Sequence, residues 1–180
     1  MTMTIPPYSD AQKHAAQSFF RTLRDQICAV FETLETELTG TPHADKPAGH
    51  FERSLWTRPD DGGAISGGGG EMSVMKGRVF EKVGVNISTV HGTFSPEFRD
   101  KIPGARDSEG AFFATGISLV AHMQSPFVPA VHMNLRLMST STGWLGGGTD
   151  LNPITPDQAD TDFFHAALKS CCDRHDPAYY

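Results

Sequence analysis

Cysteine is scarce in this chain. Only Cys28, Cys171 and Cys172 occur among the 180 residues, and the last two are adjacent. An odd, sparse set with no C-x-x-C spacing is not typical of a disulfide framework, nor of a zinc or redox motif. The cysteine content thus fits a cytoplasmic protein, which is what we expect.

Long apolar runs and clusters of basic residues are also missing. No stretch approaches the roughly 20 apolar residues of a membrane span, and the N-terminal MTMTIPPYSD has neither the basic nor the apolar region of a secretory signal. The formal net charge is −6, which argues against a nucleic-acid surface. We therefore expect a soluble protein without a membrane span or nucleic-acid partner. An anionic ligand would need a local arginine, because the overall field repels it.

What is present predicts one domain of the α+β class. A hydrophobic fraction of 38% in 180 residues is enough to bury a core. Apolar residues at three- and four-residue steps predict a helix from Ser9 to about Leu38. Thr155 as N-cap, Pro156 at N1 and Gln158 at N3 predict a second helix with a capping box. Period-two patterns predict strands at 51–58, 78–91, 112–122 and 131–139, with loops at the glycine-rich 59–77 and at 94–110. Short connections favour antiparallel pairing, with the helices packed on the sheet.

The stretch GISLVAHMQSPFVPAVHMNLRLM, residues 116–138, places its polar side chains at even-numbered positions on two predicted strands. If the hairpin is centred near Phe127, His122 faces His132 and Ser118 faces Arg136 on one side of the sheet. The alternation fits two interpretations equally: the solvent face of a half-exposed hairpin, or a binding face. These polar residues are Ser118, His122, His132, Asn134 and Arg136.

Other candidate residues give weaker signals. His165 lies at the edge of the apolar arc of the second helix, where a boundary role is the commoner one, and the histidine spacing matches no named metal motif. SGGGGEMSVMKG lacks the G-K-[ST] ending of a phosphate loop, and GGGTD is not G-x-G-x-x-G. A flexible or tightly turning loop is the favoured interpretation of both glycine runs. The alternative is backbone that approaches a flat ligand, with Asp150 at its end.

Four stretches in collinear order carry a family resemblance: SGGGGEMSVMKGRVFEKVGVNISTVHG, FFATGISLVAHMQSPFVPAVHMNLRLM, WLGGGTDLNP and DTDFFHAALKSCCDRHDPAYY. From about Trp56 to Tyr180 the chain resembles the oxygen-dependent coproporphyrinogen III oxidases of haem biosynthesis. The resemblance implies a large, flat antiparallel sheet flanked by helices on both faces, and a homodimer. It implies oxidative decarboxylation of two propionates of coproporphyrinogen III to vinyl groups, which gives protoporphyrinogen IX and CO₂.

The resemblance also assigns residues and cofactors. Ser118 and the segment Asn134, Leu135 and Arg136 match substrate-binding residues. His132 matches the catalytic proton donor. His122, His132 and His165 match assigned metal ligands. O₂ is the co-substrate and no organic cofactor is used. Bacterial members are assigned a metal dependence and other members none, so the resemblance leaves a divalent metal open.

Departures from the family pattern are local, apart from length. Leu145 stands where family members have an aromatic residue, and DLNP replaces the usual DLTP. Family members also continue beyond the position of Tyr180, so residues 1–180 are expected to form a single domain that is the N-terminal part of a longer protein or a truncated product. Two alternatives stay open: a non-catalytic tetrapyrrole-binding or partner module, and a histidine-ligated metal oxygenase.

Overall fold

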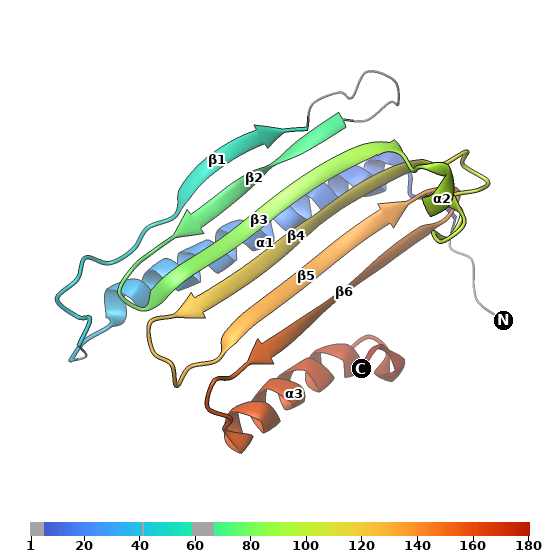
Figure 1. Cartoon of the computed structure of the whole chain (residues 1–180). Coiled ribbons are helices and arrows are strands. Elements are labelled where there is room, and N and C mark those ends of the chain that lie inside the picture. The colour runs from blue at the N-terminus through green and yellow to red at the C-terminus, as the bar shows by residue number, and fades with distance from the viewer. Residues whose placement is uncertain (1–5, 41, 59–66) are drawn as a thin grey trace.

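A computed structural model describes residues 6–40, 42–58 and 67–180. Its centre is a sheet of six antiparallel strands in the order β1-β2-β3-β4-β5-β6, so each strand pairs with its neighbours in sequence (Figure 1). Because every connection joins adjacent antiparallel strands, the sheet needs no crossover connection. The strands are β1 Glu52–Thr57, β2 Gly67–Met75, β3 Phe80–Thr93, β4 Ala111–Met123, β5 Ala130–Ser139 and β6 Gly143–Asn152.

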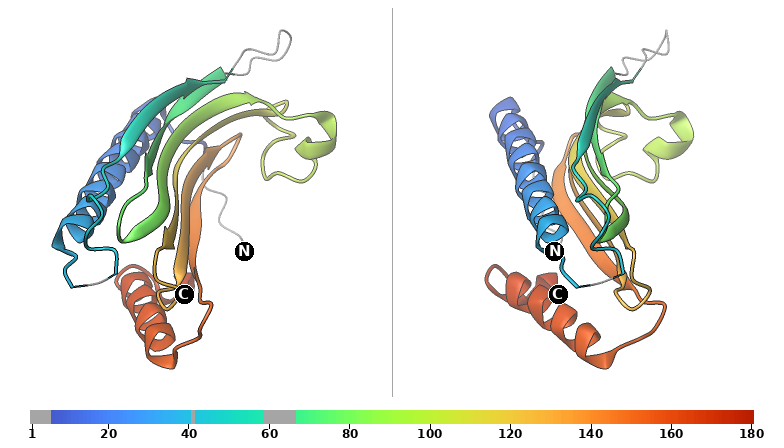
Figure 2. Two further views of the ribbon diagram at one scale, coloured as in Figure 1. Left: turned by 60° about the vertical axis from the view of Figure 1, so that its left-hand side comes forward. Right: turned by 90° about the vertical axis from the view of Figure 1, so that its left-hand side faces the viewer.

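Helix α1, Asp10–Glu37, covers one face of this sheet along β3 and β4 (Figure 2). Its first turn is closed by a capping box, in which the Gln12 backbone N–H donates to the Ser9 side chain and the Ser9 N–H donates to the Gln12 side chain. These reciprocal bonds satisfy donors that a helix start leaves unpaired. The predicted first helix is confirmed.

The hydrophobic core lies between α1 and the odd-numbered side chains of the central strands, joined by Phe80, which precedes a register irregularity in β3. Phe31 of α1 stacks on Phe80, with ring centroids 4.8 Å apart. Burial of each large side chain is worth about 1.5–3 kcal/mol, so this face supplies much of the folding free energy. The buried members are Phe20, Cys28, Met75, Phe80, Val83, Val85, Ile87, Ile117, Leu119, Ala121 and Leu137.

Two buried charged side chains tie α1 to the sheet. Arg24 donates to the Glu71 carboxylate at 2.7 Å and to the Ser73 hydroxyl at 3.2 Å. Glu35 is 0% exposed and accepts backbone N–H bonds from Gly49 and from residues 78, 79 and 80. Burial alone would raise the pKa of Glu35, but the four N–H donors outweigh it and hold that pKa below its ordinary value.

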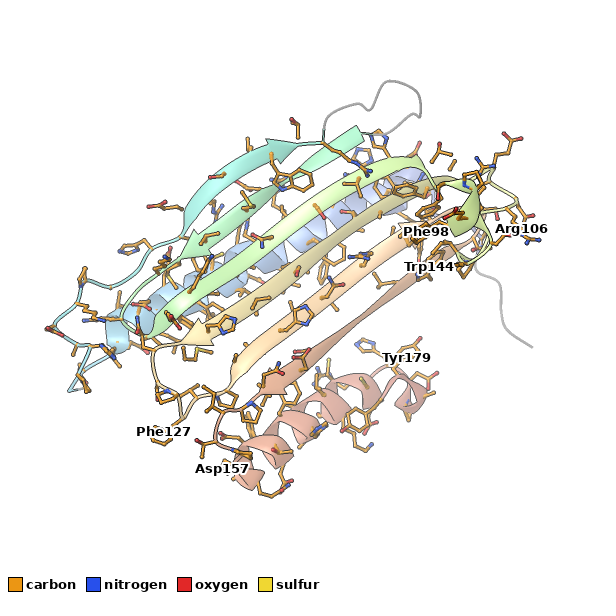
Figure 3. The ribbon with its side chains drawn as sticks, viewed as in Figure 1. Phe98, Arg106, Phe127, Trp144, Asp157 and Tyr179 are labelled. Atoms are coloured by element: carbon orange, nitrogen blue, oxygen red, sulfur yellow. The ribbon has the colours of Figure 1, made fainter. Side chains whose placement is uncertain are left out.

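Apart from Phe80, the even-numbered side chains of the strands point to the opposite side. We call this side the open face because neither α1 nor α3 covers it. The short helix α2, Pro96–Arg99, belongs to the segment that folds over one end of this face. There Phe94 stacks on Phe112 at 4.3 Å, and Phe98 and Trp144 lie at the same end of the sheet (Figure 3). The rest of the open face is bare in the described part of the chain.

The last elements lie at the β6 edge, on the same side of the sheet as α1 (Figure 2). Helix α3 spans Gln158–Asp173, and the short 3-10 helix η1, Pro177–Tyr179, packs against it. The predicted second helix is confirmed, but its N-cap is Asp157, which accepts from the backbone N–H groups of Ala159 and Asp160. The predicted cap at Thr155 is wrong, and Pro156 precedes the helix. No described helix is both long and apolar enough for a membrane span.

The predicted α+β class with an antiparallel sheet is confirmed, but both glycine runs were assigned wrongly. Residues 67–70 belong to β2 and Gly146–Gly148 to β6, so neither run is a loop. Of the rest of the first predicted loop, residues 59–66 lie outside the described residues, and residues 76–77 lie in the connection between β2 and β3. Glycine carries a loop signal because it lacks a side chain. Pairing with β1 and β3 on both sides holds β2 extended nonetheless.

The predicted register of the β4–β5 hairpin is also wrong, by two residues. Ser118 pairs with Asn134 instead of Arg136, and His132 lies opposite Val120 instead of His122. An even shift keeps every side chain on its predicted face but changes its neighbours. The two histidines are therefore not directly opposed.

Candidate functional site

Cross-strand rows on the open face show how the sheet groups its polar residues. Directly opposed residues of neighbouring strands point to the same side, so the pairings can be followed from strand to strand. One row crosses the whole sheet, and in it residues that carry a side chain alternate with glycines. It consists of Trp56, Gly70, Ser88, Gly116, Arg136 and Gly146.

The next row carries amides and a hydroxyl. Asn86 of β3 pairs with Ser118, which pairs with Asn134, which pairs with Gly148. Asn86 accepts a hydrogen bond from the Ser73 backbone N–H at 3.2 Å. The side chains of Ser118 and Asn134 make no hydrogen bond to another described residue. The row thus offers free donors and acceptors in the middle of the face.

A shallow cavity of about 260 Å³ lies where these two rows meet. Its floor includes Gly116, where an added Cβ would lie 2.4 Å from the Leu135 carbonyl oxygen. A side chain is therefore not tolerated, and the floor stays flat. The side chains around the cavity are those of Trp56, Met72, Asn86, Ser88, Ser118, Asn134 and Arg136.

Arg136 supplies the cation of this cavity. It is exposed, and none of the ion pairs in the described part of the chain includes it. A guanidinium without a protein carboxylate partner can bind a ligand carboxylate through two parallel N–H···O bonds. In a chain of net charge −6, this local cation is what an anionic ligand would need.

His132 is oriented by a residue that sequence reasoning did not include among the site residues. Its Nδ1 lies 3.1 Å from Asp150 Oδ2, across the β5–β6 pairing. Asn152 donates to the other oxygen of Asp150. A carboxylate at Nδ1 favours the tautomer with its proton there, which leaves Nε2 free toward the open face. The position of Asp150 at the end of GGGTD was the only sequence signal for this role.

The remaining predicted residues lie elsewhere. His122 pairs with Lys82 at the opposite end of β4 from α2. His165 hydrogen-bonds through Nδ1 to the Tyr180 hydroxyl at 2.8 Å, and it lines a separate cavity with Thr149 on the α1 side. Leu135 packs its side chain against the core, so only its main chain reaches the open-face cavity.

The predicted metal ligands therefore do not form a metal-binding group. Among the described residues, no three or more His, Cys, Asp or Glu side chains are placed to hold one ion. Register explains part of this, because His122 is displaced from His132 along the hairpin. The path of the chain after β6 explains the rest, because it directs His165 to the other side of the sheet edge. Among the described residues, His122, His132 and His165 thus do not come together as a donor set for a divalent metal.

Comparison with known proteins decides the family. The model of the coproporphyrinogen III oxidase family matches residues 15–180. The chain belongs to this family. Curated oxygen-dependent coproporphyrinogen-III oxidases from Rickettsia felis and Rickettsia conorii are each 54% identical to it over 168 residues, and one from Rickettsia bellii is 55% identical.

These coproporphyrinogen oxidase relatives are longer than the chain. Each alignment covers 93% of this chain but 57% of the relative. The family membership accounts for the resemblance of the four sequence stretches, and it places the open face within the shared part. The activity of the whole protein remains a matter for proposal.

Proposed function

We propose that the protein containing this chain is an oxygen-dependent coproporphyrinogen III oxidase that binds its substrate on the open face. It would convert two propionate side chains of coproporphyrinogen III to vinyl groups, yielding protoporphyrinogen IX and CO₂ with O₂ as co-substrate and no organic cofactor. The observation that carries the proposal is the cross-strand row in which an unpaired Arg136 adjoins the bare floor at Gly116.

Binding in this proposal begins with charge. The substrate carries four carboxylates, and Arg136 would pair with one propionate through a charge-assisted, bidentate contact. Ser118 and Asn134, which lie opposite each other on β4 and β5, would bind polar groups of the macrocycle. The main chain at Leu135 contributes to the cavity wall. Together these contacts would fix the propionate relative to the ring, which is a large part of the catalytic work.

The chemistry proposed for each propionate balances in a simple way. The carbon next to the ring loses a hydrogen, the bond to the carboxylate breaks to release CO₂, and a vinyl group forms. This change sets free two electrons and one proton. O₂ accepts the electrons together with that proton and a second proton from solvent, which gives H₂O₂. His132, held by Asp150 at 3.1 Å, would transfer a proton through Nε2. The electron-rich pyrrole supplies the reactivity toward O₂, so the protein mainly orients and shields it.

Two further features of the proposal come from the family resemblance. We propose that the full-length protein is a homodimer and that it works in the cytoplasm. Among the described residues, no three His, Cys, Asp or Glu side chains are placed to hold one ion, so the alternative of a histidine-ligated metal oxygenase gains no support from them.

The test uses the protein at its natural length with coproporphyrinogen III prepared by reduction under anaerobic conditions. On admission of air, protoporphyrin fluorescence should appear after oxidation of the product. Size-exclusion chromatography with light scattering measures the oligomeric state. Tight binding of coproporphyrinogen without turnover would favour the non-catalytic binding module, and no binding would overturn the proposal.

A further inference from the structure

Trp56 lies at the β1 end of the cross-strand row, and Arg136 lies in the same row on β5. Nothing in the resemblance assigns a role to Trp56. It lies on β1, half-buried, and borders the open-face cavity. A Cβ added to its partner Gly70 would lie 2.8 Å from the indole Nε1 and 2.9 Å from Cε2. The indole therefore lies down over Gly70, toward the middle of the sheet, in space that any side chain at position 70 would take.

Between the indole and Arg136 the row carries only small residues. Ser88 and Gly116 are the two positions that separate Gly70 from Arg136. Since strands are about 4.8 Å apart, the backbones at Trp56 and Arg136 are roughly 19 Å apart, and the indole shortens the gap by leaning inward. The row is thus a trough with an aromatic wall at one end and a guanidinium at the other.

The indole also has a free donor. Nε1 of Trp56 makes no hydrogen bond within the described part of the chain, and neither does the Ser88 hydroxyl. Buried tryptophan N–H groups usually find a partner. A half-buried donor beside an empty cavity is instead available to a ligand. The ligand that fits such a trough is a flat, ring-containing molecule with more than one carboxylate.

We propose that Trp56 is a substrate-binding residue of the open face. Its indole contacts one pyrrole ring of the tetrapyrrole, and its N–H donates to the propionate on that ring, while Arg136 holds a propionate at the other end of the trough. This inference rests on the proposed function for the identity of the ligand. Gly70 contributes to the same binding site, because its lack of a side chain leaves room for the indole.

The experiment measures coproporphyrin III affinity, and kcat and KM for coproporphyrinogen III, in Trp56→Phe and Trp56→Leu. Trp56→Phe keeps a ring and loses the donor, so Kd and KM should rise about tenfold, as for loss of one hydrogen bond to a charged group. Trp56→Leu also loses the ring and should raise them further. Because the reacting groups are untouched, kcat should change less than threefold.

Two matched controls keep the result specific. Leu55→Ala changes the neighbouring residue of β1, whose side chain is 81% exposed and points to the other side of the sheet. Trp144→Phe changes the second tryptophan of the chain, which lies on β6. Both should bind like the parent. In the Trp144→Phe background the remaining Trp56 emission of the 180-residue chain should be quenched by coproporphyrin III.

Each outcome has one meaning. Parent-like affinity and KM in both Trp56 variants, with Arg136→Lys weakened, would overturn the role of Trp56 and leave the proposed function standing. Absence of binding by the parent would overturn the proposed function and this inference together. Equal losses in Trp56→Phe and Leu55→Ala would assign Trp56 to the stability of β1, which circular dichroism and thermal unfolding would reveal, and would also overturn the inference.

Discussion

The two faces of the sheet are made by alternate residues of the same strands, yet they are filled in opposite ways. On the α1 side, Val85, Ile117 and Leu119 are at most 5% exposed. On the open face the neighbouring positions hold Asn86, Ser118 and Val120, and the last is 41% exposed. Packing against α1 explains the apolar side chains of the first face. It does not explain why the open face carries free hydroxyl, amide and guanidinium groups beside glycines. This combination indicates that the open face binds a ligand.

The largest effect expected from this comparison is at Glu35 on the α1 side. Glu35→Ala leaves four backbone N–H donors without their acceptor, and an unsatisfied buried donor costs about 1–3 kcal/mol. With partial relaxation we expect a loss of about 3–5 kcal/mol in the free energy of unfolding, measured with urea. Glu37→Ala, at the exposed end of the same helix, is the control and should change it by less than about 0.5 kcal/mol.

The same residue gives a pH prediction. In the folded protein the four backbone N–H donors hold the pKa of Glu35 below its ordinary value. Its carboxylate therefore stabilises the fold above the unfolded-state pKa, and this stabilisation is lost as pH falls through the folded-state pKa. The parent should lose stability on acidification below about pH 4.5 more steeply than Glu35→Gln. Parallel pH curves for the two proteins would contradict this role.

Adjacent residues of β4 compare the two faces directly. Leu119→Ala opens a cavity in the core and should cost about 2–4 kcal/mol of unfolding free energy. Val120→Ala, one residue along and on the open face, should cost less than about 1 kcal/mol, since Val120 is already 41% exposed. Both values come from urea unfolding. Similar costs at the two positions would mean that the open face is covered in solution.

Arg136→Lys tests the open face itself. The change keeps the charge but loses the planar fork, so coproporphyrin III binding should weaken by about 1–3 kcal/mol in a titration at fixed salt. Unfolding should be unaffected, because Arg136 has no ion-pair partner among the described residues. Lys82→Arg on the same face is the control. An unchanged affinity would remove Arg136 from the site.

Asp150→Asn should have the smallest effect on binding and act on turnover instead. Asn cannot hold the Nδ1–H tautomer of His132 by a charged contact, so kcat should fall about 10–100-fold, within the usual contribution of acid–base catalysis. KM and unfolding free energy should stay close to those of the parent, because Asp150 is exposed. A parent-like kcat would show that the 3.1 Å contact has no catalytic role.

Much of the fold could be predicted because alternation and periodicity report burial. The polar, even-numbered side chains of Ser118, Asn134 and Arg136 do share one face, and the first helix begins after Ser9 as its capping box requires. The exact register of the β4–β5 hairpin was not predictable. The turn at residues 124–129 fixes this register, and the alternation of polar and apolar residues does not encode the geometry of the turn.

The glycine strands could not be predicted from local signals. Gly67–Gly70 have no strand propensity of their own, and only the pairing of β2 with both neighbours keeps them extended. The same limit hid Trp56 and Asp150, since each meets its partner across a strand pair that the sequence order does not reveal. The separation of His165 from the hairpin likewise depends on the direction that the chain takes after β6, which no local sequence signal gives.

A crystal structure of the protein bound to coproporphyrin III tests the central claim most directly. The account predicts the macrocycle over Ser88, Gly116 and Asn134, with one carboxylate within hydrogen-bond distance of Arg136 and the Trp56 indole at its rim. A macrocycle bound on the α1 side, or on the open face with no carboxylate near Arg136, would contradict it.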